Sequence, residues 1–411
     1  MNIAVIGGGW AGIAAAVELV DRGARVTLFE AGRQLGGRAR RARIDGLELD
    51  NGQHILLGAY RDTLALMTRI GADPEKLLRR LPLRVEDNRG FCLALPQLPP
   101  PFNLAWGLLT ARGVSLREKL RTALWMQGLK WRQFKLPADT SVAAWLEGAG
   151  QTGTLRRHLW EPLCLAALNT PAEQASAQIF AHVLRDSLGS PATGATDLLL
   201  PRGSLSELIP DPASHWLSTR SARLRTGHRV KRIEPGAAGW QVEGETFAKV
   251  IVAVAPQHLR ALLPGQDKVP NRFEPIGTVY FHYPAGTTLP YPLRALQGGV
   301  GQWLVDRGRG VLAASLSGHG HWENMGDEAL ALALHQEMQQ PGPLPPYRVI
   351  REQRATFACL PDLPRPACRT SYPDLFLAGD YTWADYPATL EGAVRSGMAA
   401  AAACLEKAAR R

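Results

Sequence analysis

Short apolar runs and an alanine-rich stretch organise the start of the chain. Residues 3–6 form an unbroken apolar run, which predicts a buried strand. Residues 13–19 are apolar and rich in alanine, which predicts a helix, and residues 25–29 predict a second strand that ends at Glu30. The order strand, helix, strand predicts a βαβ unit and therefore an α/β protein with a parallel sheet.

The same kinds of pattern return in the middle and at the end of the chain. Residues 228–233, 240–242 and 249–256 predict a strand, a hairpin and a buried strand. Residues 375–378 predict a further strand, which a loop joins to a helical stretch at residues 394–408. No internal repeat is evident.

A glycine-rich turn follows the first predicted strand. Gly7, Gly9 and Gly12 fit the pattern G-x-G-x-x-G, with a strand before it and a helix after it. Gly7 permits the tight turn, Gly9 lets the backbone approach a pyrophosphate, and Gly12 lets the helix pack on the strand. Glu30 is placed to accept hydrogen bonds from a ribose, which predicts a dinucleotide site and disfavours the 2′-phosphate of NADP.

Two motifs downstream narrow the choice of dinucleotide. Gly36, Gly37 and Arg38 follow Glu30 closely and can supply further contacts to a pyrophosphate. A polar turn that contains Gly52 comes next. With these motifs the chain resembles the flavin-containing amine oxidase and phytoene desaturase superfamily. That resemblance implies non-covalently bound FAD, with Gly37, Arg38 and Gly52 among the cofactor-binding residues.

The C-terminal strand leads to a second part of the predicted cofactor site. Gly379 and Asp380 end the strand, and the last helix is expected to begin near Thr389 and Leu390. A helix N-terminus presents free N–H groups and positive dipole character, which would stabilise negative charge on a reduced flavin. The resemblance implies ribityl–pyrophosphate contacts for Gly379 and Asp380. It also implies isoalloxazine contacts for Thr389 and Leu390, and a backbone contact between Val230 and the adenine.

These assignments predict a chain divided between two domains. A Rossmann-like FAD-binding domain of the glutathione-reductase and amine-oxidase type is expected to be discontinuous, over residues 1–70, 200–265 and 370–411. A substrate domain of mixed sheet and helices is expected to take the two insertions, residues 71–199 and 266–369. The second insertion is predicted to hold three strands and a helix, at residues 278–283, 301–306, 311–316 and 327–339.

Composition limits the classes of protein and of partner. The 411 residues are 45% hydrophobic and 20% charged, which excludes a chain that is disordered throughout. The net charge of +10 favours polyanionic or phosphate-rich partners. Five cysteines without a CxxC pair and ten scattered histidines predict no disulfide framework and no metal site. Because neither a spanning apolar run nor a signal peptide is evident, a cytoplasmic location is expected.

Residues 101–135 combine basic and aromatic side chains. The segment holds seven basic residues, one acidic residue and three of the eleven tryptophans. Ser115 and Glu118 fit a capping box that would begin a helix. Such a helix suits an anionic membrane surface, as on the inner face of the cytoplasmic membrane, and a solvated helix packed on its own domain is the equal alternative. Nucleic-acid binding is not expected, because no stacking or groove-reading motif accompanies the charge.

Three enzyme classes of the superfamily compete as interpretations, and departures from the usual motifs count against an amine oxidase. No lysine lies between Lys268 and Lys407, so the lysine that amine oxidases place near the flavin has no counterpart. Thr389 replaces a tyrosine of their aromatic cage. Gly32 replaces an adenosine-side arginine, for which Arg33 is the candidate substitute. A carotenoid-type desaturase stays open, whereas a non-enzymatic flavin binder is disfavoured because every cofactor segment is present.

The most specific resemblance covers nearly the whole chain. Residues 387–393, together with residues 51–54, 303–307 and 354–357, resemble the bacterial hydroxysqualene dehydroxylases, also called squalene-associated FAD-dependent desaturases. The resemblance implies an enzyme that acts on a long isoprenoid lipid. The implied reaction is reductive removal of an allylic hydroxyl group from hydroxysqualene, which gives squalene for hopanoid synthesis.

Removing a hydroxyl group needs a proton donor and a source of electrons. Asp385 and Tyr386 lie in the predicted loop beside the last helix and are the candidate catalytic residues, and solvent-facing loop residues are the equal alternative. No second G-x-G-x-x-G with strand and helix context is present. Free reduced flavin, a transient nicotinamide or a redox partner is therefore expected to act as external electron donor.

Overall fold

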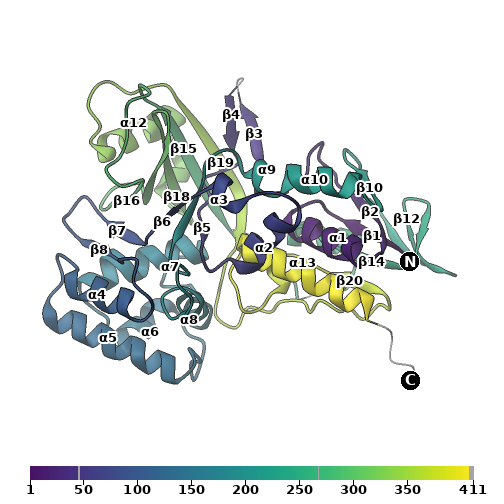
Figure 1. The fold of residues 1–411 in the computed structure, drawn as a ribbon, viewed down its shortest axis with the longest axis horizontal. Helices are drawn as coiled ribbons and strands as arrows, with labels where there is room; N and C mark the ends of the chain where they lie inside the picture. Colours follow the sequence, from purple (N-terminus) through teal and green to yellow (C-terminus); the bar gives the residue numbers. More distant parts are fainter. Residues whose placement is uncertain (45–46, 267, 407–411) are drawn as a thin grey trace.

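Three structural regions make up the computed structural model, which describes residues 1–44, 47–266 and 268–406 (Figure 1). One region contains a parallel sheet with helices, a second contains an antiparallel sheet with one long helix, and the third consists of helices. The predicted α/β class is therefore confirmed. The end of the helix predicted at residues 394–408 lies outside the described residues.

The parallel sheet joins strands from the start, middle and end of the chain. Its order is β10-β2-β1-β14-β20, and every neighbouring pair is parallel. The strands span Asn2–Ile6 (β1), Arg25–Phe29 (β2), Ala222–Arg225 (β10), Lys249–Val252 (β14) and Leu375–Leu377 (β20). The apolar residues of β1, β2, β14 and β20 are buried on both faces, which is why these strands are mostly apolar in the sequence.

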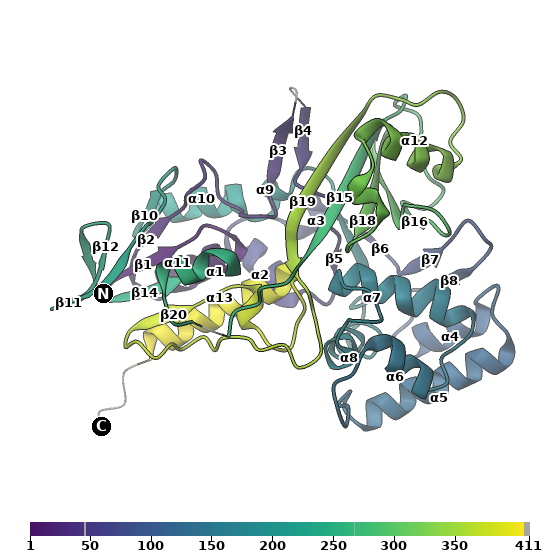
Figure 2. The ribbon, with the colours of Figure 1, turned by 180° about the vertical axis from the view of Figure 1, so that it is seen from behind.

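Helices α1 (Trp10–Asp21) and α13 (Leu390–Leu405) lie side by side against this sheet, as both ribbon views show (Figures 1 and 2). They approach closely because small residues face each other. A Cβ atom on Gly397 would lie 2.1 Å from the carbonyl oxygen of Ala11. Shorter helices complete the region, at Leu205–Leu208 (α9), Pro210–Ser218 (α10) and Pro256–Leu262 (α11).

Residues 228–232 form no strand, so the prediction that placed one there is wrong. Backbone N–H groups at residues 227–228 bond instead to the carbonyl oxygens of Gly32 and Glu30, at 2.7 and 2.9 Å. These bonds hold the segment along the turn after β2 as irregular backbone. Antiparallel pairing follows, between β11 (Ile233–Gly236), β12 (Gly239–Val242) and β13 (Glu245–Phe247).

The antiparallel sheet has the order β16-β17-β18-β15-β19 and carries helix α12 (Asp327–Met338). Its strands span Phe273–His282 (β15), Leu293–Ala295 (β16), Trp303–Gly308 (β17), Val311–Ser317 (β18) and Tyr347–Phe357 (β19). The predicted strands at residues 278–283, 301–306 and 311–316 and the predicted helix are confirmed. Strand β19 was not predicted, because its many charged residues interrupt any apolar pattern. Figure 2 shows β15 and β19 running from this sheet toward the centre of the molecule.

The helical region contains α4 (Phe102–Thr110), α5 (Leu116–Trp131), α6 (Val142–Gly148), α7 (Glu161–Leu168) and α8 (Ala177–Asp186). A π-helical turn at Arg156–Trp160 precedes α7. Ser115 begins α5 as predicted, because its hydroxyl accepts a hydrogen bond from the Glu118 N–H at 3.3 Å. The reciprocal half of the predicted capping box is absent, since the Glu118 carboxylate accepts from the Leu155 N–H at 2.7 Å.

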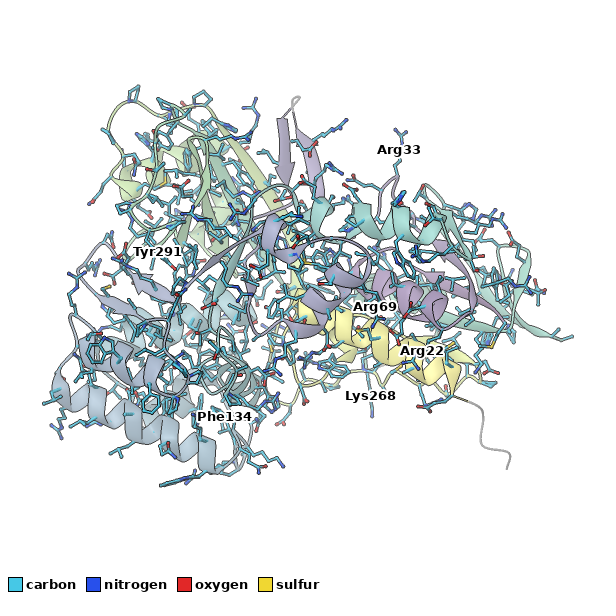
Figure 3. All side chains as sticks on the ribbon, viewed as in Figure 1. Arg22, Arg33, Arg69, Phe134, Lys268 and Tyr291 are labelled. Carbon is cyan, nitrogen blue, oxygen red and sulfur yellow. The ribbon has the colours of Figure 1, made fainter. Side chains whose placement is uncertain are left out.

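Short elements connect the regions. A hairpin of β3 (Arg41–Ile44) and β4 (Leu47–Asp50) leads to β5 (Leu56–Leu57), α2 (Arg61–Arg69), α3 (Pro74–Leu77) and β6 (Leu78–Leu81). A hairpin of β7 (Arg84–Glu86) and β8 (Cys92–Ala94) follows, and β9 (Leu198–Pro201) pairs with β5 and β6. Tyr291 donates its hydroxyl to the carbonyl oxygen of Pro82 and so links the antiparallel sheet to this part of the chain (Figure 3). The predicted domain boundaries near residues 70 and 200 both fall at the β5-β9-β6 sheet, and the division itself stays a prediction.

Candidate active site

The glycine-rich turn places backbone against backbone at the start of α1. Gly7 has a φ of +107°, a conformation that favours glycine. A Cβ atom on Gly12 would lie 1.8 Å from the carbonyl oxygen of Gly7, so this position admits no side chain. Gly9 precedes α1 without a side-chain cap, and the first turn of α1 contains no acidic residue. The N–H groups at this helix end are therefore available to an anion.

A glycine-lined space lies next to this helix end. Gly36 donates its N–H to the carbonyl oxygen of Gly8 at 2.8 Å, which aligns the two glycine-containing loops. A Cβ atom on Gly37 would lie 3.1 Å from the Gly9 Cα atom. Around a Cβ atom on Gly9, the nearest described neighbour would be the Gly37 Cα atom at 3.9 Å. This free space is the arrangement that the sequence predicts for a pyrophosphate.

Glu30 and Val230 lie at the same end of the site. The two carboxylate oxygens of Glu30 accept hydrogen bonds from the N–H groups of Gly8 and Gly32, at 2.7 and 2.6 Å. Each oxygen keeps acceptor capacity for a ribose hydroxyl. Val230 is buried, and its backbone N–H and carbonyl groups make no hydrogen bond within the described residues. Both groups therefore remain available to an adenosine, and the contact itself stays a prediction.

An open, arginine-rich pocket adjoins the turn after Glu30. Its volume is about 680 Å³, and it is lined by Gly32, Arg33, Gln34, Arg40, Arg41 and Arg43. Figure 3 shows the Arg33 side chain extending outward from this region of the molecule. Arg33 is thus exposed at the rim of the pocket, and its contact with an adenosine stays a prediction.

Arg38 and Asp380 join the N-terminal and C-terminal parts of the site. One guanidinium nitrogen of Arg38 lies 2.7 Å from the Asp380 carboxylate, and the other donates to the carbonyl oxygen of Ala355 at 2.7 Å. Asp380 is buried, so Arg38 balances its charge in a protected position. Gly379, which has a φ of +151°, donates its N–H to the Ser396 hydroxyl at 2.9 Å. Three residues predicted to bind the cofactor therefore meet here.

The last helix begins where the sequence predicts. Leu390 is its first residue, and the Thr389 hydroxyl accepts a hydrogen bond from the Gly392 N–H at 3.1 Å. The hydroxyl caps a single N–H group of the first turn. The N-terminus of α13 consequently keeps positive dipole character on the side where Thr389 and Leu390 are half-buried.

Glu391 is a residue whose role the sequence did not reveal. Its side chain is fully buried and accepts hydrogen bonds from the N–H groups of Asp62 and Thr63, at 3.1 and 2.9 Å. It also accepts from the Thr63 hydroxyl at 2.7 Å and pairs with Arg395 at 2.9 Å. The carboxylate thus caps α2 and holds it against α13. Glu391 belongs to the motif at residues 387–393, but only its contact with α2 shows what its side chain does.

Asp50 fastens the polar turn at residues 50–54 to the antiparallel sheet. Its carboxylate is buried, lies 3.1 Å from the Arg307 guanidinium and accepts from the Leu205 N–H at 2.7 Å. The Tyr280 hydroxyl donates to the Asp50 carbonyl oxygen at 3.2 Å. Burial raises the pKa of Asp50, and the charge of Arg307 acts in the opposite direction.

His54 lies in this fastened turn and presents one free ring nitrogen. Its Nδ1 donates to the carbonyl oxygen of Gly52 at 3.1 Å, where Gly52 has a φ of +88°. Its Nε2 has no partner among the described residues. Burial is the main cause that lowers the pKa of His54, and the charge of nearby Asp50 partly opposes it. The imidazole is therefore an oriented group with a free nitrogen, which sequence reasoning noted only as part of a motif.

Arg365 anchors the loop that precedes α13. Its guanidinium donates to the carbonyl oxygens of Trp383 and Tyr386, at 2.8 and 2.5 Å, and lies 4.6 Å from the centre of the Phe357 ring. Burial lowers the pKa of Arg365. A buried cation that bonds two carbonyl groups of one loop fixes the path of that loop.

The two predicted catalytic residues of this loop differ in their surroundings. The Tyr386 hydroxyl is buried and donates to the carboxylate of Asp186 at the end of α8. Burial and the Asp186 hydrogen bond both raise the pKa of Tyr386. The Asp385 side chain is 59% exposed, and its backbone carbonyl bonds to the His182 ring at 3.1 Å. The loop therefore brings Tyr386, but not the Asp385 carboxylate, into the interior.

Comparisons with known proteins match this geometry. A model of the family "Flavin containing amine oxidoreductase" matches residues 10–405. The chain belongs to this family. It is 30% identical to the hydroxysqualene dehydroxylase of Rhodopseudomonas palustris, with 97% of each chain covered. It is 25% identical to the zeta-carotene desaturase of a Synechocystis strain, with 100% of this chain and 98% of that protein covered.

A solved structure shows the same fold. An oxidoreductase from Methanosarcina mazei superposes with a TM-score of 0.73 at 15% identity, covering 97% of this chain and 99% of that chain. The predicted resemblance to the hydroxysqualene dehydroxylases is confirmed. As a member of this family, the protein is an FAD-dependent oxidoreductase, and the predicted cofactor is confirmed.

The residues present fit FAD. The uncapped start of α1, the free space at Gly9 and the open acceptors of Glu30 would hold the pyrophosphate and ribose. The Arg38–Asp380 pair and the start of α13 would lie along the flavin half of the cofactor. The individual contacts of these residues stay predictions.

The positions of the lysine side chains distinguish this site from the one expected of an amine oxidase. Lys268 is exposed, and Figure 3 shows it at the periphery of the molecule, beyond α13. Lys249 pairs with Asp374 at 3.3 Å at the far end of the parallel sheet. Among the described residues, no lysine side chain contacts Arg38, Asp380, His54 or Tyr386. The candidate site thus lacks, within the described part of the chain, the lysine expected of an amine oxidase.

Proposed function

We propose that this enzyme reductively removes the hydroxyl group of hydroxysqualene and releases squalene. The observation that carries the proposal is the end-to-end match to a hydroxysqualene dehydroxylase, which covers 97% of both chains. The match includes the regions around the cofactor site as well as the antiparallel and helical regions. The lack of a lysine beside the site, among the residues that the structure describes, separates it from the site of an amine oxidase.

The reaction must move a hydride and a proton. The allylic C–O bond breaks, a C–H bond forms at the same allylic system, and the oxygen leaves as water. The hydride would be the contribution of reduced FAD, when that cofactor is bound. Two electrons come from outside the chain, from a nicotinamide, free reduced flavin or a redox partner. The protein must orient the lipid, exclude water and deliver the proton.

We assign to His54 the role of donating the proton to the departing oxygen. Its Nδ1–H is held by the Gly52 carbonyl oxygen, so an added proton resides on Nε2, which has no partner among the described residues. The turn that carries it is fixed by Asp50 and Arg307. A protonated Nε2 can donate to the departing oxygen. Because burial lowers the pKa of His54 from its usual value of about 6.5, the donating form is lost as pH rises through the acidic range below that value.

Tyr386 and Asp385, the candidate proton donors from the sequence analysis, stay alternatives to His54. Tyr386 directs its proton to Asp186, which favours an orienting role for this pair. Asp385 is largely exposed to solvent. The three candidates can therefore be separated by parallel substitutions: His54→Gln, Tyr386→Phe and Asp385→Asn.

The decisive experiment is anaerobic single turnover. Purified enzyme, photoreduced and mixed with hydroxysqualene, is expected to form one squalene per flavin while the flavin is reoxidised. In His54→Gln the rate should fall by two to four orders of magnitude, roughly the contribution of a general acid. Gly9→Ala should retain the fold but lose FAD and all turnover. Formation of no squalene by FAD-loaded wild-type enzyme would contradict the proposal.

A desaturase is the second candidate, favoured by the full-length match to a zeta-carotene desaturase at 25% identity. It would run electrons in the opposite direction, from a polyene precursor to oxidised FAD. Mixing oxidised enzyme with phytoene or zeta-carotene under anaerobic conditions tests it. Bleaching of the flavin with formation of a more conjugated polyene would support the desaturase.

The place of action forms part of the proposal. Among the described residues no helix is both long and apolar enough to cross a bilayer. Hydroxysqualene, however, partitions into lipid. We therefore place the enzyme at the inner face of the cytoplasmic membrane, attached peripherally.

A further inference from the structure

Helices α4 and α5 carry an apolar surface that no described part of the chain covers. Eleven large hydrophobic side chains are exposed in the described part of the chain, and eight of them fall between residues 98 and 131. We call these eight the α4–α5 face: Leu98, Phe102, Trp106, Leu109, Leu116, Leu120, Leu124 and Trp131. Such a concentration marks an interaction surface, since isolated exposed apolar residues are scattered singly.

Helical spacing aligns seven of these residues on the outward sides of the two helices, and Leu98 precedes α4. On α4 the exposed positions follow i, i+4 and i+7, and on α5 Leu116, Leu120 and Leu124 are each separated by four residues. The inward side of α5 carries Met126 and Leu129, which are buried. Helix α5 therefore has two apolar sides, whereas a helix on a water-exposed surface has one. Both ribbon views place α5 at the outer edge of the helical region (Figures 1 and 2).

Positive charge surrounds the α4–α5 face. Arg112, Arg117, Arg132 and Lys135 are exposed, and no basic residue between 112 and 135 makes an ion pair within the described residues. Glu118, the single acidic residue of the segment 101–135, is engaged by the Leu155 N–H. The surface thus offers apolar insertion with unpaired cations around it. An anionic lipid headgroup layer over acyl chains is the chemistry that complements this combination.

We propose that the α4–α5 face docks on an anionic phospholipid membrane, with the apolar side chains at the level of the acyl chains and the basic residues among the phosphates. This inference rests on the proposed function, because a lipid substrate gives the enzyme a reason to be there. A second copy of the chain fits less well, since a two-fold contact would bring two strongly positive faces together.

The docking face connects to the candidate site through packed aromatic residues. Trp125 of α5 lies 5.0 Å from Trp145 of α6, between ring centres, and Trp145 lies 6.4 Å from Phe180 of α8. Helix α8 ends at Asp186, which bonds to Tyr386. Helix α5 of the docking face is therefore connected through α6 to α8, the helix that supports one side of the candidate site.

Vesicle flotation with the FAD-loaded full chain tests the proposal. We expect the wild type to float with vesicles of phosphatidylcholine and phosphatidylglycerol, and at least tenfold less with phosphatidylcholine alone. Leu120→Ser/Leu124→Ser should lose binding at least tenfold, and so should Arg117→Glu/Arg132→Glu. The matched controls are Leu332→Ser on α12 and Arg260→Glu on α11, both exposed outside the face. These controls should float like the wild type.

Activity in detergent separates this proposal from the proposed function. The α4–α5 variants should retain wild-type turnover on detergent-solubilised hydroxysqualene, because they lie outside the candidate site. Absence of flotation, or flotation that neither variant reduces, overturns the docking even if turnover is normal. A dimer that forms through these helices and is lost in the leucine variant, without vesicle binding, overturns it in favour of self-association. Vesicle binding without turnover would contradict the proposed reaction and would leave the membrane docking supported.

Discussion

Helices α1 and α5 contain many apolar residues but use them in opposite ways. In α1 every residue from Trp10 to Val20 is buried, against the parallel sheet and α13. In α5 only Thr122, Met126 and Leu129 are buried, and leucines with one tryptophan occupy the outward side. Helix α1 carries no basic residue, whereas α5 carries four. One helix completes a core, and the other leaves a surface for something outside the chain.

The different burial of α1 and α5 shows that apolar content alone does not identify a core helix. Burial of α1 follows from glycine and alanine, which let it approach α13 and the glycine turn closely. Helix α5 has larger side chains on two sides, and the fold covers only one. Substitutions at comparable positions of different helices test this contrast, because their effects on stability should differ.

The largest difference is expected between two helical glycines. Gly12→Ala should lower the free energy of unfolding by roughly 3 kcal/mol or more, because its Cβ would lie 1.8 Å from the Gly7 carbonyl oxygen. Gly128→Ala on α5 meets no atom within 4 Å and should raise it by about 0.5–1 kcal/mol. Urea unfolding with excess FAD measures both. Equal effects would show that α1 is not packed as described.

Two leucines form the next pair. Leu19→Ala removes a fully buried side chain from α1 and should cost about 2–5 kcal/mol. Leu124→Ala removes a side chain that is 73% exposed and should change stability by no more than about 0.5 kcal/mol. Thermal or urea unfolding in the absence of lipid gives both values. A large loss for Leu124→Ala would mean that its helix face is covered in the free protein.

Two N-cap residues should have similar effects on stability but different effects on the cofactor. Thr389→Ala and Ser115→Ala each remove a hydroxyl that caps a helix and should each cost about 1 kcal/mol. Only Thr389→Ala is expected to weaken FAD retention, because it disturbs the start of α13. Unfolding experiments and flavin absorbance after gel filtration separate the two properties. Equal FAD retention in both variants would contradict the assignment of Thr389.

The smallest effect concerns pH. The pKa of His54 is lowered by burial, so the folded protein binds fewer protons here than the unfolded chain below about pH 6.5. Above that pH, His54 is neutral in both states and does not lower the free energy of unfolding. As pH falls below it, the unfolded chain binds the proton more readily, so the free energy of unfolding decreases. His54→Gln should show a shallower loss of unfolding free energy between about pH 7 and 5 than the wild type. An unchanged slope would place His54 in solvent.

Local sequence patterns were sufficient for the elements around the cofactor. Gly7, Gly9 and Gly12 have fixed spacing within a strand–turn–helix unit, and each is needed for a backbone reason that the sequence already shows. The start of α13 at Leu390 was predicted from the change between loop and helix composition. These signals are short-range, which is why they could be recognised without coordinates.

Contacts between distant segments could not be predicted in this way. Arg365 bonds the loop before α13, Arg307 pairs with Asp50, and Asp186 accepts a hydrogen bond from the Tyr386 hydroxyl. Each is a charged residue whose partner cannot be identified from the neighbouring sequence, because the contact joins different segments of the chain. The irregular path of residues 228–232 was mispredicted for the same reason, because its hydrogen bonds go to the turn after β2.

By itself the sequence determined the nucleotide-binding unit, the flavin family and the concentration of basic and aromatic residues at 101–135. Those properties depend on residue type and spacing along one stretch of chain. Tertiary structure alone decided that Glu391 caps α2, that His54 keeps a free nitrogen in a fastened turn, and that the leucines of α5 point outward. A helix with two apolar sides has no preferred orientation until the rest of the chain packs against one of them.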